Sequence, residues 1–332
     1  MPKPWQQALL SSGLPLENDL RSLLTAKGCI ANFEYSYLKP DENTIEREFS
    51  YDLDASYIKG AYFMNLMVEC KYRHPGTKWV FAPDEYGGPD ELSPNDFLHV
   101  IDDFMDLKFP YGDRFPRQLA PLCNKGVELL PDGANEKTVT QALSQLSYAL
   151  APQLASAIEH QVNRWLAVDQ IFCHIPVVAT TAELYRLKSE TRLESIRAAK
   201  ELEDVAVREP CLVMKYFPGA DLQRYNATVF NRHADRVGVK KLKSTIRSYT
   251  EDLSHYYSVL ANRSCPKAIV FVTVDQAQAG INHLFSYLDD LIKPSASLLS
   301  EIRSSEKQLA KLLSTMKKGI SKPAHKRGSG DA

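Results

Sequence analysis

The sequence has almost no net charge: 40 Lys+Arg stand against 41 Asp+Glu in 332 residues, which leaves a formal charge of −1. Proteins that coat nucleic acid rely on bulk positive charge, so this average argues against that class. Long apolar runs are also missing, and none approaches the roughly 20 residues of a transmembrane helix. No membrane partner is therefore expected. The composition, 44% hydrophobic and 24% charged, is typical of a globular protein.

Closely spaced cysteines are missing as well. The six cysteines include no Cys-x-x-Cys pair, and no short-spaced Cys/His set exists, so a structural zinc site is not expected. The N-terminus carries no charged-then-apolar leader. Together these features predict a reduced, cytoplasmic protein with free thiols. The eight histidines are scattered without ligand spacing and are predicted to be structural or surface residues.

The near-zero charge is an average over two unequal ends. Residues 1–110 hold 10 Lys+Arg and 18 Asp+Glu, whereas residues 236–332 hold 16 and 8. Such asymmetry can mark a nucleic-acid partner. The basic end would contact phosphates if it folded back beside the acidic end, and a coincidence of solvated faces is the alternative. The basic candidates are Lys240, Lys241, Lys243, Lys317 and Lys318.

Helical and strand-like patterns alternate along the chain, which predicts an α/β fold with a mixed central sheet flanked by helices. The expected strands span residues 29–38, 48–58, 62–71, 171–179, 211–217 and 268–274, and Trp79 to Phe81 is expected to pack as a strand. The expected helices span 14–27, 136–150, 152–167, 188–207, 276–292 and 297–318, with Pro152 as an interruption and a helical segment at 220–262. Segments 83–95 and 110–135 read as loops, and 180–187 as a loop or the start of a helix.

Acidic side chains gather near the end of an apolar strand. Glu69 and Lys71 lie two residues apart at the end of the run 62–71, so on a strand they share a face. Asp52 and Asp54 share a face of the preceding strand, and an antiparallel hairpin would bring them beside Glu69. Converging carboxylates repel one another, and Mg²⁺ or Mn²⁺ would relieve that repulsion. A solvent-exposed ion pair of Glu69 and Lys71 is the alternative.

These residues resemble the PD-(D/E)xK nuclease superfamily, which has the restriction-endonuclease-like fold. The resemblance is carried by four pieces: the helix from Leu16 to Gly28, the strand Tyr51–Ala55, the strand Val68–Lys71, and the helix Ala142–Tyr148 with the strand Ile175–Thr181. It is best over residues 14–72 and continues more weakly to about 187. The proline of the family's name is absent, because Leu53 precedes Asp54.

The resemblance implies a role for each candidate residue. Asp54 and Glu69 would bind the metal, with Asp52 as the alternate to Asp54 and the backbone carbonyl of Cys70 as a further ligand. Lys71 would orient or deprotonate the attacking water, and Glu17 would reach the metal directly or through water. Gln145 would lie near the site, with Gln141 as its competitor. Expected phosphate contacts are Arg73, Arg47 and Lys78.

The resemblance implies a nuclease domain over residues 1–292, with insertions near 72–135 and 188–265. A C-terminal amphipathic helix at 293–318 and a disordered basic tail at 319–332 would follow. The helix is expected to dock on the domain, with self-association into a homo-oligomer as the alternative. The expected activity is Mg²⁺-dependent hydrolysis of phosphodiester bonds by a DNA endonuclease. An RNA-directed nuclease and a catalytically inactive nucleic-acid-binding or assembly module are the alternatives.

Overall fold

The computed structural model describes residues 3–40, 45–84, 96–110, 115, 117–131, 133–164, 169–247, 252–304, 307 and 311. Twelve strands form a single mixed sheet. The strands are β1 Cys29–Pro40, β2 Glu46–Lys59, β3 Tyr62–Lys71, β4 Lys78–Pro83, β5 His99–Ile101, β6 Leu122–Leu130, β7 Gly133–Asn135, β8 Ile171–Thr180, β9 Glu183–Leu187, β10 Ala206–Glu209, β11 Cys211–Lys215 and β12 Ala268–Thr273. The predicted α/β class with a mixed central sheet is confirmed.

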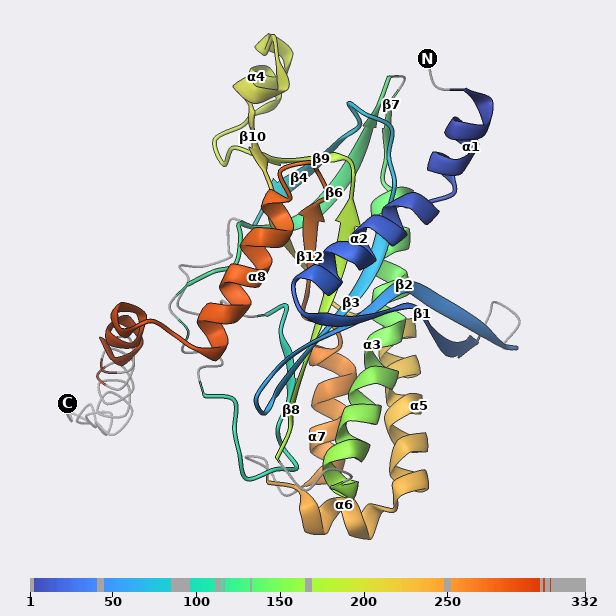
Figure 1. Cartoon of the computed structure of the whole chain (residues 1–332), viewed down its shortest axis with the longest axis vertical. Coiled ribbons are helices and arrows are strands. Elements are labelled where there is room, and N and C mark those ends of the chain that lie inside the picture. Colours follow the sequence, from blue (N-terminus) through green and yellow to red (C-terminus); the bar gives the residue numbers. More distant parts are fainter. Residues whose placement is uncertain are drawn as a thin grey trace, which may run out of the picture.

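The helices cover both faces of this sheet (Figure 1). They are α1 Pro4–Ser11, α2 Leu14–Ala26, α3 Lys137–Asn163, α4 Leu193–Ala198, α5 Ala220–Val237, α6 Val239–Thr245, α7 Leu253–Val259 and α8 Ala279–Ile292. Helices α3, α5 and α7 share one hydrophobic core, and α2 and α8 share the core on the other face. Among the described residues, none of these helices is both long enough and apolar enough to cross a bilayer.

The first three strands form an antiparallel meander that leads into the centre of the sheet. A turn at Gly60, where φ is +59°, joins β2 to β3, a conformation that glycine adopts without steric cost. Strand β3 then runs parallel to β8, in register from Tyr62 opposite Ile171 to Lys71 opposite Thr180. Every residue of β8 is buried, as expected for a parallel strand covered on both faces.

The sheet curls back on itself beyond β8. The order along the sheet is β1-β2-β3-β8-β12-β11-β6-β4-β9-β10, with β5 on β8 and β7 on β6. Only two residues separate β8 from β9 in the chain. The path across the sheet from β8 through β12, β11, β6 and β4 ends at β9, and so it returns to the segment that directly follows β8. Aromatic rings pack there: Phe271 lies 5.0 Å from Phe81 and 6.2 Å from Trp79 between ring centroids.

Several boundaries differ from the sequence prediction. Helix α3 runs without a break through Pro152, because Leu150, Ala151 and Leu154 on both sides of it are buried in the core. The predicted loop at 110–135 contains β6 and β7, and the segment 180–187 contains β9 rather than a helix. Most of 188–207 is not helical: α4 buries no residue, so the charged segment lacks the apolar face that would hold a longer helix on the domain.

The two predicted insertions contribute to this same fold. Residues 72–135 supply β4 to β7, and residues 188–265 supply β10 and β11 together with α4 to α7. The predicted C-terminal helix is described in part: residues 296–304 are helical, and Leu298 and Ile302 are buried in the α2/α8 core. Most of the remainder of 293–318 and all of the basic tail at 319–332 lie outside the described residues. Self-association stays a prediction.

Candidate functional site

A carboxylate of β2 reaches the strand that ends in Glu69 and Lys71. The ladder between β2 and β3 ends at Leu53 opposite Val68. One residue further, an oxygen of the Asp52 side chain accepts a hydrogen bond from the backbone N–H of Cys70 at 2.6 Å. The Asp52 side chain therefore takes the place of a ladder bond, and its charge lies beside Glu69.

Glu69 is a carboxylate with one oxygen engaged and one unpartnered. Its side chain is 1% exposed; Oε1 pairs with the Lys71 ammonium, and Oε2 has no hydrogen-bond partner among the described residues. The pKa of Glu69 is raised to about 7, mainly by burial and also by the charge of Asp52, while Lys71 opposes the shift. Such a site favours the uptake of a positive charge, either a proton or a cation.

Helix α3 supplies the residue that holds Lys71. Besides pairing with Glu69, the Lys71 ammonium donates to Oε1 of Gln145 at 3.3 Å. Gln145 is itself fixed, since its side-chain amide donates to the Ser50 carbonyl at 3.4 Å and its backbone carbonyl accepts from the Tyr37 hydroxyl at 2.9 Å. The competing candidate Gln141 is exposed. Of the two predicted glutamines, Gln145 is therefore the one that contacts the site.

Helix α2 brings Glu17 within electrostatic reach. Leu16, Leu20 and Leu24 are buried and hold this helix against the sheet. Burial raises the pKa of the Glu17 carboxyl, the charges of Asp52 and Glu34 raise it further, and Lys71 lowers it. The predicted association of Glu17 with the β2–β3 acids thus exists as charge coupling, with no direct contact to them among the hydrogen bonds described.

Glu34 is a further acid that the sequence analysis did not select. It lies on β1 between the pairs Phe33–Leu53 and Tyr35–Tyr51, so its place in the register is opposite Asp52. Its Oε1 accepts a hydrogen bond from the Ser50 hydroxyl at 2.9 Å, and its φ of +57° is unusual for a residue other than glycine. Only the strand register could have identified it, because no motif marks it.

The structure separates Asp54 from this cluster. Its carboxylate accepts from the Tyr51 hydroxyl at 2.6 Å and lies 3.4 Å from the side-chain amide of Gln153 on α3. Burial raises the pKa of Asp54, and the Tyr51 hydroxyl lowers it. Asp54 was the first choice as metal ligand, and Asp52 the alternate. The hydrogen bonds place Asp52 at the site and Asp54 in a buried polar network further along the strand.

The predicted phosphate contacts are scattered. Arg73 pairs with the buried Glu128 at 2.8 Å, and Lys78 lies 5.4 Å from the centroid of the Tyr185 ring. Both therefore have structural partners. Arg47 lines a cavity beside the site, described below.

The basic α6 is remote from the acids. Lys241 donates to the Asn163 side chain at 2.6 Å, and Asn163 ends α3. Gln145 lies 18 residues earlier on that helix, about 27 Å away at 1.5 Å per residue. Helix α6 therefore does not fold back beside the site, as was predicted for Lys240, Lys241 and Lys243. Lys317 and Lys318 lie outside the described residues.

The negative charge of the residues at the site suits a hard cation such as Mg²⁺ better than their arrangement does. Within the described ranges, no group of three or more His, Cys, Asp or Glu side chains is assembled to hold a metal. Yet Oε2 of Glu69 is buried with no hydrogen-bond partner in the described part of the chain, and Asp52 and Glu17 both raise the pKa of Glu69. Oxygen-rich, mutually repelling carboxylates are the donor set that Mg²⁺ takes. Metal ligation by Asp52, Glu69, Glu17 and the Cys70 carbonyl stays a prediction.

Comparisons with known proteins give no match: neither a protein-family model, nor a curated protein, nor a solved structure is similar to this chain. The functional argument therefore depends on the geometry of the site alone.

Proposed function

We propose that this chain is a metal-dependent nuclease that hydrolyses phosphodiester bonds, with a core of the restriction-endonuclease-like type. The observation that carries the proposal is the meeting of Asp52, Glu69 and Lys71 at the point where β2 leaves β3. Asp52 accepts a hydrogen bond from the Cys70 N–H, and Lys71 pairs with Glu69. Among the described residues, the second oxygen of Glu69 is buried without a hydrogen-bond partner. Two acids and a lysine in this arrangement suit the reaction of a phosphate diester.

Each residue has a task in this reaction. A divalent cation, when bound, would polarise the phosphoryl oxygen and lower the pKa of a bound water. Asp52 and Glu69 would hold it through carboxylate oxygens, with the Cys70 carbonyl and Glu17 completing the set. With Glu69 holding a cation, the Lys71 ammonium would be free to contact a phosphate oxygen or the attacking water. Gln145 limits how far Lys71 moves, because it holds the ammonium from the α3 side.

The order of elements supports the fold part of the proposal. Helix α2 precedes the meander of β1, β2 and β3; α3 then leads to β8, which pairs parallel to β3. This matches the helix, hairpin, helix and strand that the sequence resemblance identifies. DNA is proposed as the substrate ahead of RNA, and a substrate panel decides between them.

Cleavage assays test the proposal directly. Purified protein is incubated with labelled single-stranded DNA, duplex DNA and RNA, with Mg²⁺, Mn²⁺ or EDTA. The wild type should cut at least one substrate with metal, and Lys71→Met should lose about 100-fold or more of that rate. Lys59→Met is the matched control, since Lys59 lies on the neighbouring strand and is exposed. A wild type without metal-dependent cleavage, or equal rates for all three proteins, contradicts the proposal.

A catalytically inactive nucleic-acid-binding module is the second candidate, and one observation favours it. The Lys71–Glu69 ion pair already satisfies one oxygen of the key carboxylate. Calorimetric titration with Mg²⁺ separates the two candidates. A nuclease should bind the cation in a way that Glu69→Gln abolishes, whereas an inactive module should bind nucleic acid without binding Mg²⁺.

A further inference from the structure

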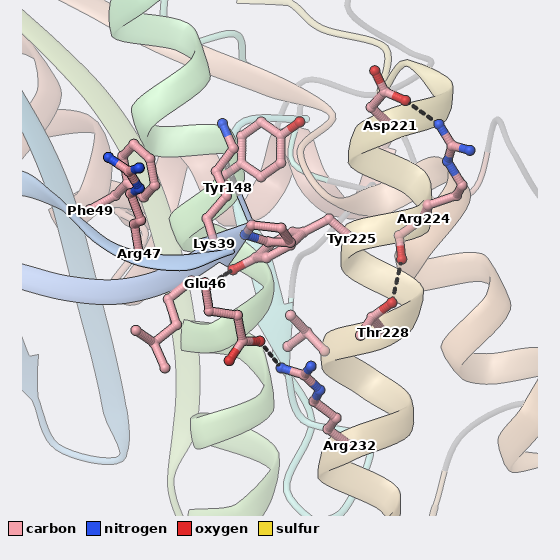
Figure 2. A pocket seen from close by; sticks show the side chains of 13 residues that line it. Lys39, Glu46, Arg47, Phe49, Tyr148, Asp221, Arg224, Tyr225, Thr228 and Arg232 are labelled. Atoms are coloured by element: carbon pink, nitrogen blue, oxygen red, sulfur yellow. Dashed lines mark hydrogen bonds and ion pairs between the residues drawn. The ribbon is translucent and has the colours of Figure 1, made fainter. Parts of the chain in front are cut away.

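A large cavity adjoins the candidate site. It has a volume of about 950 Å³, within the range of small-molecule sites. The ends of β1 and β2 form one wall, and α3 and α5 form the other (Figure 2). We call it the β1–α5 groove, defined by Lys39, Arg47, Tyr148, Arg224, Tyr225 and Arg232. A neighbouring cavity of about 540 Å³ shares Tyr225 and Arg232 with it and continues along α3 and α5.

Cations outnumber anions in this groove. Lys39, Arg47, Arg224 and Arg232 line it, against the acids Glu46 and Asp221. Arg224 pairs with Asp221 and Arg232 with Glu46 (Figure 2). The side chains of Arg224 and Asp221 are 79% and 81% exposed, and exposed pairs of this kind are worth little. Both arginines can therefore exchange their carboxylate for a phosphate at small cost.

Lys39 lies over two aromatic rings. Its ammonium lies 3.5 Å from the centroid of the Tyr148 ring and 5.3 Å from that of Phe49, and it takes part in none of the ion pairs among the described residues. Burial lowers the pKa of Lys39. A partly desolvated ammonium that packs on aromatic rings gains more from an arriving phosphate than a lysine already paired with an acid.

Aromatic faces complete the groove. Tyr148 and Tyr225 pack edge to face at 5.0 Å between centroids, and the Tyr225 hydroxyl donates to the Leu38 carbonyl at 2.9 Å, which fixes that ring. When a phosphate draws the Lys39 ammonium away, the face of Tyr148 that it covers becomes open to a flat ligand. Aromatic rings for bases beside cations for phosphates are the recurring elements of single-strand binding.

The groove lies next to the candidate site along both α3 and β2. Tyr148 follows Gln145 by one turn of α3, about 4.5 Å along the axis, and Gln145 contacts Lys71. On the strand side, Phe49 precedes Ser50, whose carbonyl accepts from the Gln145 amide. A phosphate at Lys71 would therefore have its neighbouring nucleotide at the mouth of the groove.

We propose that the β1–α5 groove binds a nucleotide of a single strand, with its base against Tyr148 and its phosphate between Lys39 and the α5 arginines. This inference deepens the proposed nuclease function, because it names single-stranded nucleic acid as the substrate class and the groove as the place where the strand enters. A base reaches the concave wall only when it is unpaired and unstacked, which excludes the interior of a duplex. The adjoining cavity along α5 provides room for a further nucleotide.

Binding is measured without metal, so that its outcome is independent of cleavage. Fluorescence anisotropy with a labelled 12-nucleotide single strand in EDTA compares wild type with Tyr148→Ala, Tyr148→Phe and Arg232→Gln. We expect Tyr148→Ala to weaken binding about tenfold or more, as for other stacking residues, and Tyr148→Phe to stay within about twofold. Arg232→Gln should weaken binding several-fold and reduce its salt dependence. Arg208→Gln on β10, likewise exposed and ion-paired, is the matched control and should change nothing.

Three results would overturn the inference: unchanged affinity in Tyr148→Ala and Arg232→Gln, equal affinity of the wild type for a blunt duplex, and displacement of the strand by equimolar mononucleotide. The last would identify a site for a free nucleotide. Because Arg232 is exposed, Arg232→Gln still tests the groove if the Tyr148→Ala variant fails to fold. If the protein binds the single strand through Tyr148 but never cleaves it, the proposal for the groove stands and the proposed nuclease activity is wrong. If the protein cleaves with metal while both variants bind the strand as tightly as the wild type, the nuclease proposal stands and the proposal for the groove is wrong.

Discussion

The carboxylate of Asp52 accepts a hydrogen bond from the backbone N–H of Cys70 at 2.6 Å. This single bond ties the end of the β2–β3 ladder to the residue between Glu69 and Lys71. It also distinguishes Asp52 from Asp54, whose carboxylate bonds instead to the Tyr51 hydroxyl. Two aspartates two residues apart thus have different environments, and the proposed chemistry assigns them different tasks.

Exchanging each aspartate for asparagine should separate those tasks. Asp52→Asn keeps an acceptor for the Cys70 N–H but removes the charge, so it should fold normally and lose about 100-fold or more of metal-dependent cleavage. Asp54→Asn should keep activity within a few-fold and lose about 1 kcal/mol of stability, because a neutral acceptor replaces a charged one for the Tyr51 hydroxyl. Cleavage rates and urea unfolding of both variants measure this. The reverse pattern would restore Asp54 as the metal ligand.

The raised pKa of Glu69, about 7, predicts a pH dependence of the metal-free protein. A carboxyl whose folded pKa lies above its unfolded value near 4.5 gives stability that is full below pH 4.5 and lost as the pH rises through 7. In EDTA, the wild type should therefore lose stability between pH 5 and pH 8 relative to Glu69→Gln, by an amount on the order of 1 to 3 kcal/mol. Urea unfolding at each pH checks the slope.

Added Mg²⁺ should reverse that loss. A cation that binds the folded state at 100 times its dissociation constant stabilises it by about 2.7 kcal/mol. Mg²⁺ should therefore raise the unfolding midpoint of the wild type at pH 8 and leave that of Glu69→Gln unchanged. A midpoint that responds equally in both proteins would show that the ion binds elsewhere.

Much of the site could be predicted from local pattern. The two-residue period of a strand correctly puts Glu69 and Lys71 on one face, and the apolar positions Leu16, Leu20 and Leu24 correctly predict α2. The choice between Asp52 and Asp54 could not be made this way. Both lie on the same face by period, and the difference depends on where β2 stops pairing with β3, which tertiary packing decides.

The elements missed by the sequence analysis depend on long-range contacts. Helix α3 continues through Pro152 because its buried neighbours on both sides outweigh the lost hydrogen bond. Strand β6 pairs with β4 and β11, partners far from it in the chain, and its own sequence has no strong alternation. The closure of strands β8 to β4 around Phe271 follows from such pairings, so no local sequence pattern predicts it.

Gly126 on β6 tests that closure. A Cβ at this position would lie 2.5 Å from the Phe81 ring, which is fully buried. Gly126→Ala should therefore destabilise the protein by about 1–3 kcal/mol, as overpacking in a core does. Gly133→Ala on β7, where a Cβ would meet nothing within 4 Å, is the control and should change stability by less than about 0.5 kcal/mol. Adding Phe81→Leu to Gly126→Ala should recover part of the loss, and full tolerance of Gly126→Ala would contradict the packing.

Two histidines make the fold sensitive to acid. His99 and His174 face each other across the β5–β8 pair, and burial lowers the pKa of each to about 3. Because unfolded histidine titrates near 6.5, the unfolded state binds more protons between pH 6.5 and 3. Stability is thus full above pH 6.5 and falls as the pH drops, by up to about 1.4 kcal/mol per pH unit for each histidine.

Both ring nitrogens of His174 are buried without a hydrogen-bond partner among the described residues, so His174→Leu should cost little at pH 7.5 and reduce the slope below pH 6 by about one proton. Urea unfolding between pH 7.5 and 5 measures these slopes, and equal slopes in the wild type and His174→Leu would show that this histidine takes up its proton without unfolding.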